Sequence, residues 1–186
     1  LTVLIVWTLA SIGSAGINVG EVFFAKDVLG AGTFGFGLVV ASTGAGLVVG
    51  GLSAPAVIRT IGVRAAYGGS IAWMGLGFLA VSRAPTLAVA APLIALATIG
   101  NGCALVCNQL LVQRGAPDTM RGRAIAVLMS VYFAVQGLAM AGAGWLIDRE
   151  GTRTVWALSA VIYLVCGGLS FALMLLLRVR VEPVEK

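Results

Sequence analysis

Long uncharged apolar stretches alternate along the chain with short segments that contain its charged residues. Each stretch is close to or above the roughly 20 residues that a helix needs to cross the hydrocarbon core of a bilayer. This pattern predicts an all-α membrane protein with a six-helix transmembrane bundle over residues 1–178 and a tail at 179–186. The six transmembrane helices are predicted at about 1–24, 34–58, 64–82, 86–113, 122–147 and 154–178.

The composition supports this prediction. Hydrophobic residues make up 60% of the chain and charged residues 10%, against roughly 25% charged residues in an ordinary soluble domain. A single large soluble core is therefore excluded. The net charge of +5 does not indicate nucleic-acid binding, because the basic residues are not gathered into one patch with interleaved aromatics.

The basic residues instead predict the orientation in the membrane. If the loops lie alternately on the two sides, one side has eight basic residues and the other has four. The first set is Arg59, Arg64, Arg114, Arg121, Arg123, Arg178, Arg180 and Lys186, and the second is Lys26, Arg83, Arg149 and Arg153. Because cytoplasmic loops are enriched in Lys and Arg, we expect the first side, and both ends of this segment, to be cytoplasmic in a multi-pass protein of the inner (plasma) membrane.

Residues for common enzymatic chemistry are missing from the sequence. The chain has no His, so Ser–His catalysis and His-ligated metal sites are excluded. Cys103, Cys107 and Cys166 have no spacing typical of a metal site or a disulfide framework. We therefore predict no catalytic residues, no metal, no cofactor and no enzymatic activity.

Polar side chains inside the predicted helices are candidates to line a cavity, since each needs a partner or water in the membrane. Asn18 and Glu21 are three residues apart and share a helix face, as do Tyr132 and Gln136 at a spacing of four. The candidates are Asn18, Glu21, Asn101, Asn108, Gln109, Tyr132 and Gln136. For the Asn and Gln residues, hydrogen bonding between helices without a role in transport is an equally open interpretation.

Glu21 is the acidic residue nearest to a membrane interior in this pattern. It lies about 30 Å along a helix that starts at Leu1, close to the outer interface. Two interpretations follow, an interfacial carboxylate near Lys26 or a group that binds substrate or protons.

Small residues recur every four positions in the second predicted helix, at Ser42, Gly46, Gly50 and Ala54. Small residues let membrane helices approach closely. Gly35, Gly37, Gly44 and Gly51 are expected to widen this stripe, and Ala134, Gly137, Ala141 and Gly144 form a similar one in the fifth helix. These stripes have two open interpretations, static packing between helices or a surface that slides during a conformational cycle.

Two predicted cytoplasmic loops and one outer loop have recognisable sequences. Residues 117–123 are PDTMRGR, residues 59–64 are RTIGVR and residues 144–153 are GWLIDREGTR. The first resembles the P-x-x-x-R-G-R element of major facilitator superfamily exporters. The second resembles a decayed copy of that superfamily's G-x-x-x-D-R-x-G-x-R loop motif, with Ala54 and Ile58 in place of its Gly and Asp. The third matches the motif in full, at the outer end of the fifth helix.

The chain as a whole resembles the C-terminal six-helix half of a twelve-helix major facilitator transporter, closest to bacterial drug:proton antiporter-like exporters. The resemblance implies alternating access against an N-terminal six-helix half, which would be the partner together with lipid. It also implies that helices one, two, four and five line the cavity or the interface and that three and six face lipid.

The loop residues Arg59, Arg64, Asp118, Arg121 and Arg123 have two interpretations, state-dependent gating contacts or plain topological anchors. The predicted function is secondary export of small amphipathic or hydrophobic compounds, with proton coupling left open. The alternative is a six-span channel or scaffold without transport, although no ring of charges typical of a selectivity filter is present.

Overall fold

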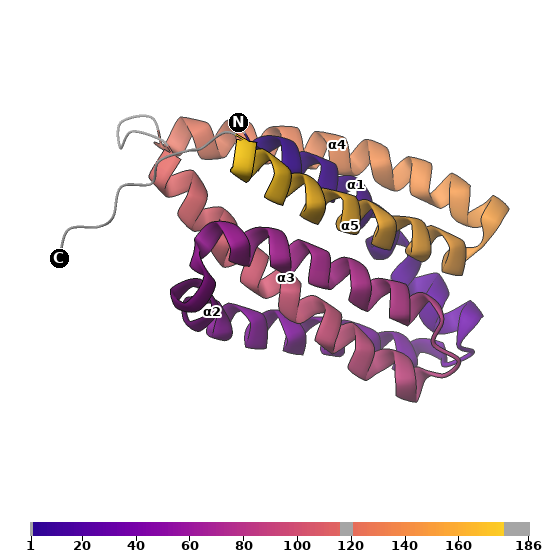
Figure 1. Ribbon diagram of the computed structural model, residues 1–186. Coiled ribbons are helices and arrows are strands. Elements are labelled where there is room, and N and C mark those ends of the chain that lie inside the picture. The colour runs from indigo at the N-terminus through magenta and orange to yellow at the C-terminus, as the bar shows by residue number, and fades with distance from the viewer. Residues whose placement is uncertain (1, 116–120, 177–186) are drawn as a thin grey trace.

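The computed structural model describes residues 2–115 and 121–176 (Figure 1). Its elements are α1 (Thr2–Phe23), the π-helical turn η1 (Phe24–Val28), α2 (Gly32–Ser82), α3 (Leu87–Gly115), α4 (Arg121–Glu150) and α5 (Thr152–Leu176). The helices run along a common axis and form an elongated bundle, in which α1, α4 and α5 lie together on one side and α2 and α3 on the other.

Helix α2 is broken at Gly62, where the backbone has φ 80° and ψ 154°. A straight helix of 51 residues would be about 77 Å long, more than twice the thickness of a bilayer core. Glycine adopts this positive φ without the steric cost of a Cβ, and the chain reverses direction there (Figure 1). Residues 32–61 are called the first segment of α2 below, and residues 63–82 the second.

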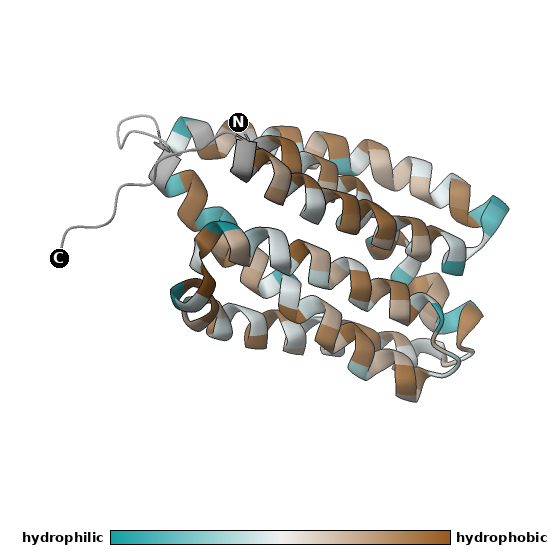
Figure 2. Ribbon diagram, in the orientation of Figure 1, coloured by the Kyte–Doolittle hydropathy of each residue, from teal (hydrophilic) through white to brown (hydrophobic). Residues whose placement is uncertain are grey.

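The second and third predicted helices meet directly at this break. The predicted connection over residues 59–63 is helical on both sides of Gly62, so the reversal takes place at one glycine and not in a separate loop. Five helices in the described ranges are long and apolar enough to cross a membrane, namely Ile5–Val28, Gly32–Ser82, Leu87–Gln113, Ile125–Glu150 and Thr152–Leu173. Hydrophilic residues gather near the two ends of the bundle, and the length between them is mostly apolar (Figure 2).

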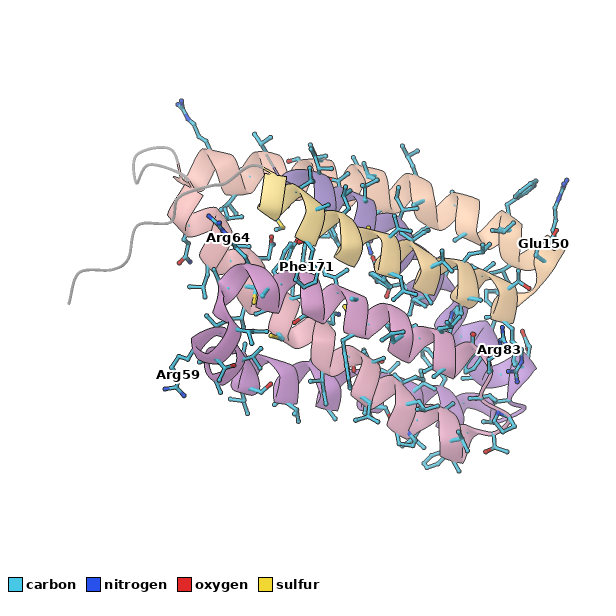
Figure 3. The ribbon with its side chains drawn as sticks, in the orientation of Figure 1. Arg59, Arg64, Arg83, Glu150 and Phe171 are labelled. Atoms are coloured by element: carbon cyan, nitrogen blue, oxygen red, sulfur yellow. The ribbon has the colours of Figure 1, made fainter. Side chains whose placement is uncertain are left out.

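The two ends of the bundle have different charged residues. Arg59 and Arg64 lie at one end, and Arg83 and Glu150 lie at the other (Figure 3). We call these the Arg59 end and the Arg83 end. This arrangement places the turn at Gly62 and the turn after α2 on opposite sides, as antiparallel neighbours require.

Glycines on the first segment of α2 are in close contact with α3. A Cβ at Gly46 would meet the Thr98 side chain and the Ala95 carbonyl, and a Cβ at Gly50 would meet the backbone of Ile99. Gly46, Gly50 and Ala54 are buried, and Ser42, at the start of the stripe, is half-buried. The four-residue stripe therefore faces α3.

The glycines expected to widen this stripe do not share one environment. A Cβ at Gly35 would meet Ala31, whereas Gly37, Gly44 and Gly51 have nothing within 4 Å of an added Cβ. Gly51 follows Gly50 directly, and one residue turns a helix by about 100°. These three glycines, spaced by seven, therefore form a separate, outward face.

Helix α1 packs against α5 through a glycine series that sequence analysis did not single out. A Cβ at Gly16 would meet the hydroxyl of Ser159, and one at Gly20 would meet the Trp156 indole. Helix α4 is much less enclosed, since Ile147 is its one buried residue among those whose burial is described. Its own glycines, Gly137 and Gly144, also have open space beside them.

Candidate functional site

A cavity of about 260 Å³ lies between the helices. Its walls come from α1, both segments of α2, α3, α4 and α5, so residues far apart in the sequence meet around it. They are Trp7, Ala10, Ser11, Ser14, Ile17, Asn18, Glu21, Thr43, Leu47, Ile71, Met74, Phe78, Thr98, Asn101, Ala104, Leu105, Tyr132 and Tyr163. We call this the central cavity.

Glu21 provides the one carboxylate among these lining residues, and neither Lys nor Arg is among them. The Thr43 hydroxyl, on the first segment of α2, donates a hydrogen bond of 3.3 Å to Oε1 of Glu21. The side chain thus points between α1 and α2. Glu21 thus lines the cavity, whereas Lys26 is exposed.

An aromatic pair forms another part of the wall. The rings of Trp7 and Tyr132 are 5.6 Å apart between centroids, which joins α1 to α4. The Trp7 indole N–H is buried and has no hydrogen-bond partner within the described residues. Buried polar groups normally have partners, and Trp7 lines the cavity, so this indole N–H is an unpaired donor of a cavity-wall residue. A second contact joins the same two helices, since the Gln136 amide donates a hydrogen bond of 3.2 Å to the Ser14 hydroxyl.

The predicted cavity residues fall into two groups. Asn18, Glu21, Asn101 and Tyr132 line the central cavity, and Gln136 contacts it through Ser14. Asn108 and Gln109 are not among the lining residues. Asn108 is 5% exposed and its Oδ1 atom has no partner in the described part of the chain, whereas Gln109 is exposed. Seven residues correspond to about 10 Å along a helix, so Asn108 shares the face of Asn101 but lies farther along the bundle.

Several lining residues were not predicted. Ile71, Met74 and Phe78 come from the second segment of α2 and Tyr163 comes from α5, although the resemblance implied that these two helices face lipid. Apolar and aromatic cavity residues cannot be told from ordinary packing residues by composition. Thr43 and Thr98 were missed because a helical Thr can bond its own backbone, as Thr98 does with the Ile94 carbonyl at 2.8 Å.

The predicted gating residues lie away from the cavity. Arg59 is exposed and Arg64 is half-buried at the Arg59 end. Arg123 is exposed in the first turn of α4, and Arg121 is the first residue of that helix. Asp118 lies outside the described residues.

The three thiols are free and buried. Within the described ranges, no group of three His, Cys, Asp or Glu side chains is arranged to hold a metal ion. The polar chemistry of the cavity therefore rests on one carboxylate, amides, hydroxyls and an indole N–H.

The family model of the Major Facilitator Superfamily matches residues 2–186. Neither a curated protein nor a solved structure matches the chain.

Proposed function

The chain belongs to the Major Facilitator Superfamily of transporters and is a multi-pass membrane protein; from this premise we propose that it exports small amphipathic or hydrophobic compounds through the central cavity. The observation that supports this most directly is the cavity itself. It combines apolar and aromatic walls with few polar groups, which is how small-molecule sites gain affinity and orientation. Glu21 and the Trp7 indole N–H supply an acceptor and an unpaired donor.

Glu21 is the proposed coupling residue. A carboxylate inside a membrane protein is expensive unless it has a function or a partner, and the hydrogen bond that Glu21 accepts from Thr43 is long at 3.3 Å. Protonation would remove its charge and weaken its attraction for a positively charged or strongly polar group. The carboxylate can therefore alternate between a proton and a substrate during export.

The chain is proposed to act as the C-terminal six-helix half of a twelve-helix transporter of the inner membrane. Counting the two segments of α2 separately gives six crossings. The outward faces of α2 and α4, with Gly37, Gly44, Gly51, Gly137 and Gly144, have no neighbours within 4 Å of an added Cβ. Close helix contact through small residues makes these two faces the proposed surface for an N-terminal six-helix half, and the Arg59 end is proposed to be cytoplasmic.

Transport by the full-length protein tests the proposal. Inside-out vesicles containing the protein should accumulate ethidium against its gradient when a proton gradient is applied, and the initial rate should saturate with dye concentration. A channel would instead give a rate that does not saturate. Vesicles that neither accumulate nor exchange any of a panel of amphipathic dyes would contradict the proposal.

A further inference from the structure

Arg153, in the first turn of α5, reaches across to the end of α2. Its Nη1 atom donates to the Ser82 carbonyl at 2.9 Å, and its Nη2 atom donates to the Ala84 carbonyl at 2.8 Å. One guanidinium thus bonds two backbone carbonyls, two residues apart in the sequence, in a forked geometry that Lys cannot reproduce. Arg153 is also the last residue of the pattern in 144–153, whereas Arg149 of the same pattern lies over Trp145 of its own helix at 4.1 Å.

The contact benefits α2 and not α5. The last carbonyls of a helix have no partners within it, and a cation near that end interacts favourably with the helix dipole. At the end of α2, the Arg83 N–H bonds the carbonyls of Ala80 and Val81, and Pro85 has no N–H to offer. In the first turn of its own helix, by contrast, a cation is unfavourable. The position of Arg153 is therefore explained by its hydrogen bonds to the carbonyls at the end of α2, and not by stabilisation of α5.

Arg153 also contacts η1. Its guanidinium carbon lies 5.8 Å from the centroid of the Phe24 ring, within the range of a cation–π interaction. Phe24 is fully buried and begins the π-helical turn Phe24–Val28. Such turns contain one residue more than an α-helical turn and often occur at functional sites.

From Phe24 a series of ring contacts leads to the central cavity. Phe24 stacks on Trp156 at 4.2 Å between centroids, Trp156 meets the edge of Phe78 at 5.9 Å, and Phe78 lies 6.2 Å from Tyr163. We call Phe24, Trp156, Phe78 and Tyr163 the aromatic column. Phe78 and Tyr163 line the cavity, so the column joins the Arg83 end to the cavity wall through α5, η1 and α2.

We propose that Arg153 is a positioning residue for the central cavity: by holding the end of α2 and Phe24 together, it keeps the aromatic column in place and so closes the cavity toward the Arg83 end. This inference deepens the proposed transport function, in which one end must close while the other opens. When Arg153 loses its hydrogen bonds to the Ser82 and Ala84 carbonyls, η1 is no longer held against the end of α2. The aromatic column can then move away from that end.

Side-specific labelling tests the proposal without requiring transport. Leu105 lines the cavity, and Leu105→Cys is introduced into the full-length protein after Cys103, Cys107 and Cys166 are replaced by Ser. A membrane-impermeant maleimide is applied to vesicles of each orientation. In Arg153→Gln, the rate of labelling through the Arg83 end should rise by about fivefold or more, because a contact made in only one state typically shifts an equilibrium by that factor. The rate of labelling through the Arg59 end should not rise.

Arg153→Lys should behave like Arg153→Gln, because a single ammonium cannot bond both carbonyls in the forked geometry. Arg149→Gln is the matched control and should label at the parent rate. If Arg153→Gln does not fold, Phe24→Leu provides the same test, since it removes the ring and leaves both carbonyl bonds.

Parent-rate labelling in these variants, or an equal rise from both ends, would overturn the proposal. If the parent protein exports no dye while the variants label as expected, the transport function is contradicted and this inference stands.

Discussion

Glu21 and Asp27 are two acids of the same helical stretch with different surroundings. Glu21 lines the central cavity and accepts a hydrogen bond from Thr43, whereas Asp27 is exposed in η1. A carboxylate that exchanges a proton with solvent during each cycle must be able to lose its charge inside the cavity. Position in the bundle, and not acidity alone, thus distinguishes the two.

Glu21→Gln should therefore slow proton-driven dye export by about 5- to 150-fold, the range of typical coupling free energies. The amide keeps the size of the side chain and its hydrogen bond with Thr43 but cannot be ionised. The measurement is the initial rate of ethidium uptake into inside-out vesicles with and without a proton gradient. Asp27→Asn is the control and should keep the gradient dependence. A Glu21→Gln protein with full gradient-driven export would exclude this carboxylate from coupling.

At the scale of the helices, Gly50 and Gly51 are neighbours in sequence with opposite environments. A Cβ at Gly50 would run into the backbone of Ile99 on α3, whereas a Cβ at Gly51 meets nothing within 4 Å. Backbone atoms cannot move aside as a flexible side chain can. A larger side chain at Gly50 must therefore push α2 and α3 apart, whereas one at Gly51 leaves their contact unchanged.

Gly50→Leu should lower the free energy of unfolding by at least the roughly 1–3 kcal/mol typical of overpacking a core. Gly51→Leu, the matched control, should leave the unfolding temperature in detergent unchanged. Thermal unfolding followed by tryptophan fluorescence distinguishes the two. If Gly51→Leu unfolds normally yet abolishes export in vesicles, the outward face of α2 is needed for contact with another part of the transporter. Equal stability of both variants would be inconsistent with the α2–α3 contact.

The helices could be predicted from the sequence because insertion into a bilayer demands long uncharged stretches, and those are visible without any tertiary information. The break at Gly62 and the π-helical turn at Phe24 were not predicted in this form. The first lies at a single glycine with positive φ, and the second begins at Phe24, whose contacts with Trp156 and Arg153 come from distant parts of the sequence. Which glycine face meets a neighbouring helix was also beyond the pattern, since a Cβ at Gly46 would meet α3 and a Cβ at Gly51 would meet nothing within 4 Å.

The candidate site was predictable to the extent that polarity defines it. Asn18, Glu21, Asn101 and Tyr132 were identified because polar side chains inside a membrane need a partner or water, and they do line the cavity. The walls contributed by Met74, Phe78 and Tyr163 resemble ordinary packing in sequence and became recognisable only when five helices were placed together. Asn108 is not among the lining residues, because helical periodicity gives the face of a residue but not its depth relative to a cavity.

At the scale of the whole molecule, the two ends of the bundle predict an orientation. The turn at Arg59 and Arg64 lies opposite the turn after Arg83, and the positive-inside rule assigns the more basic end to the cytoplasm. In a cysteine-free background, Thr119→Cys should then be labelled by an impermeant maleimide only in inside-out vesicles. Thr86→Cys, an exposed position at the other end, should be labelled only in right-side-out vesicles. External labelling at position 119 would reverse the assignment.

Arg121 and Arg123 have two open roles at the scale of the whole molecule, gating contacts made in one conformational state or anchors that fix the orientation in the membrane. If Arg121 and Arg123 make contacts in one conformational state only, removing their charge shifts the equilibrium between states, by about 5- to 150-fold for a typical coupling. Arg121→Ala with Arg123→Ala should therefore slow export, while Arg59, Arg64 and Arg114 preserve the orientation. Export rates, with Leu105→Cys labelling from both ends, measure this, and Arg149→Ala is the control. A double variant with parent export and parent labelling would make both arginines topological anchors.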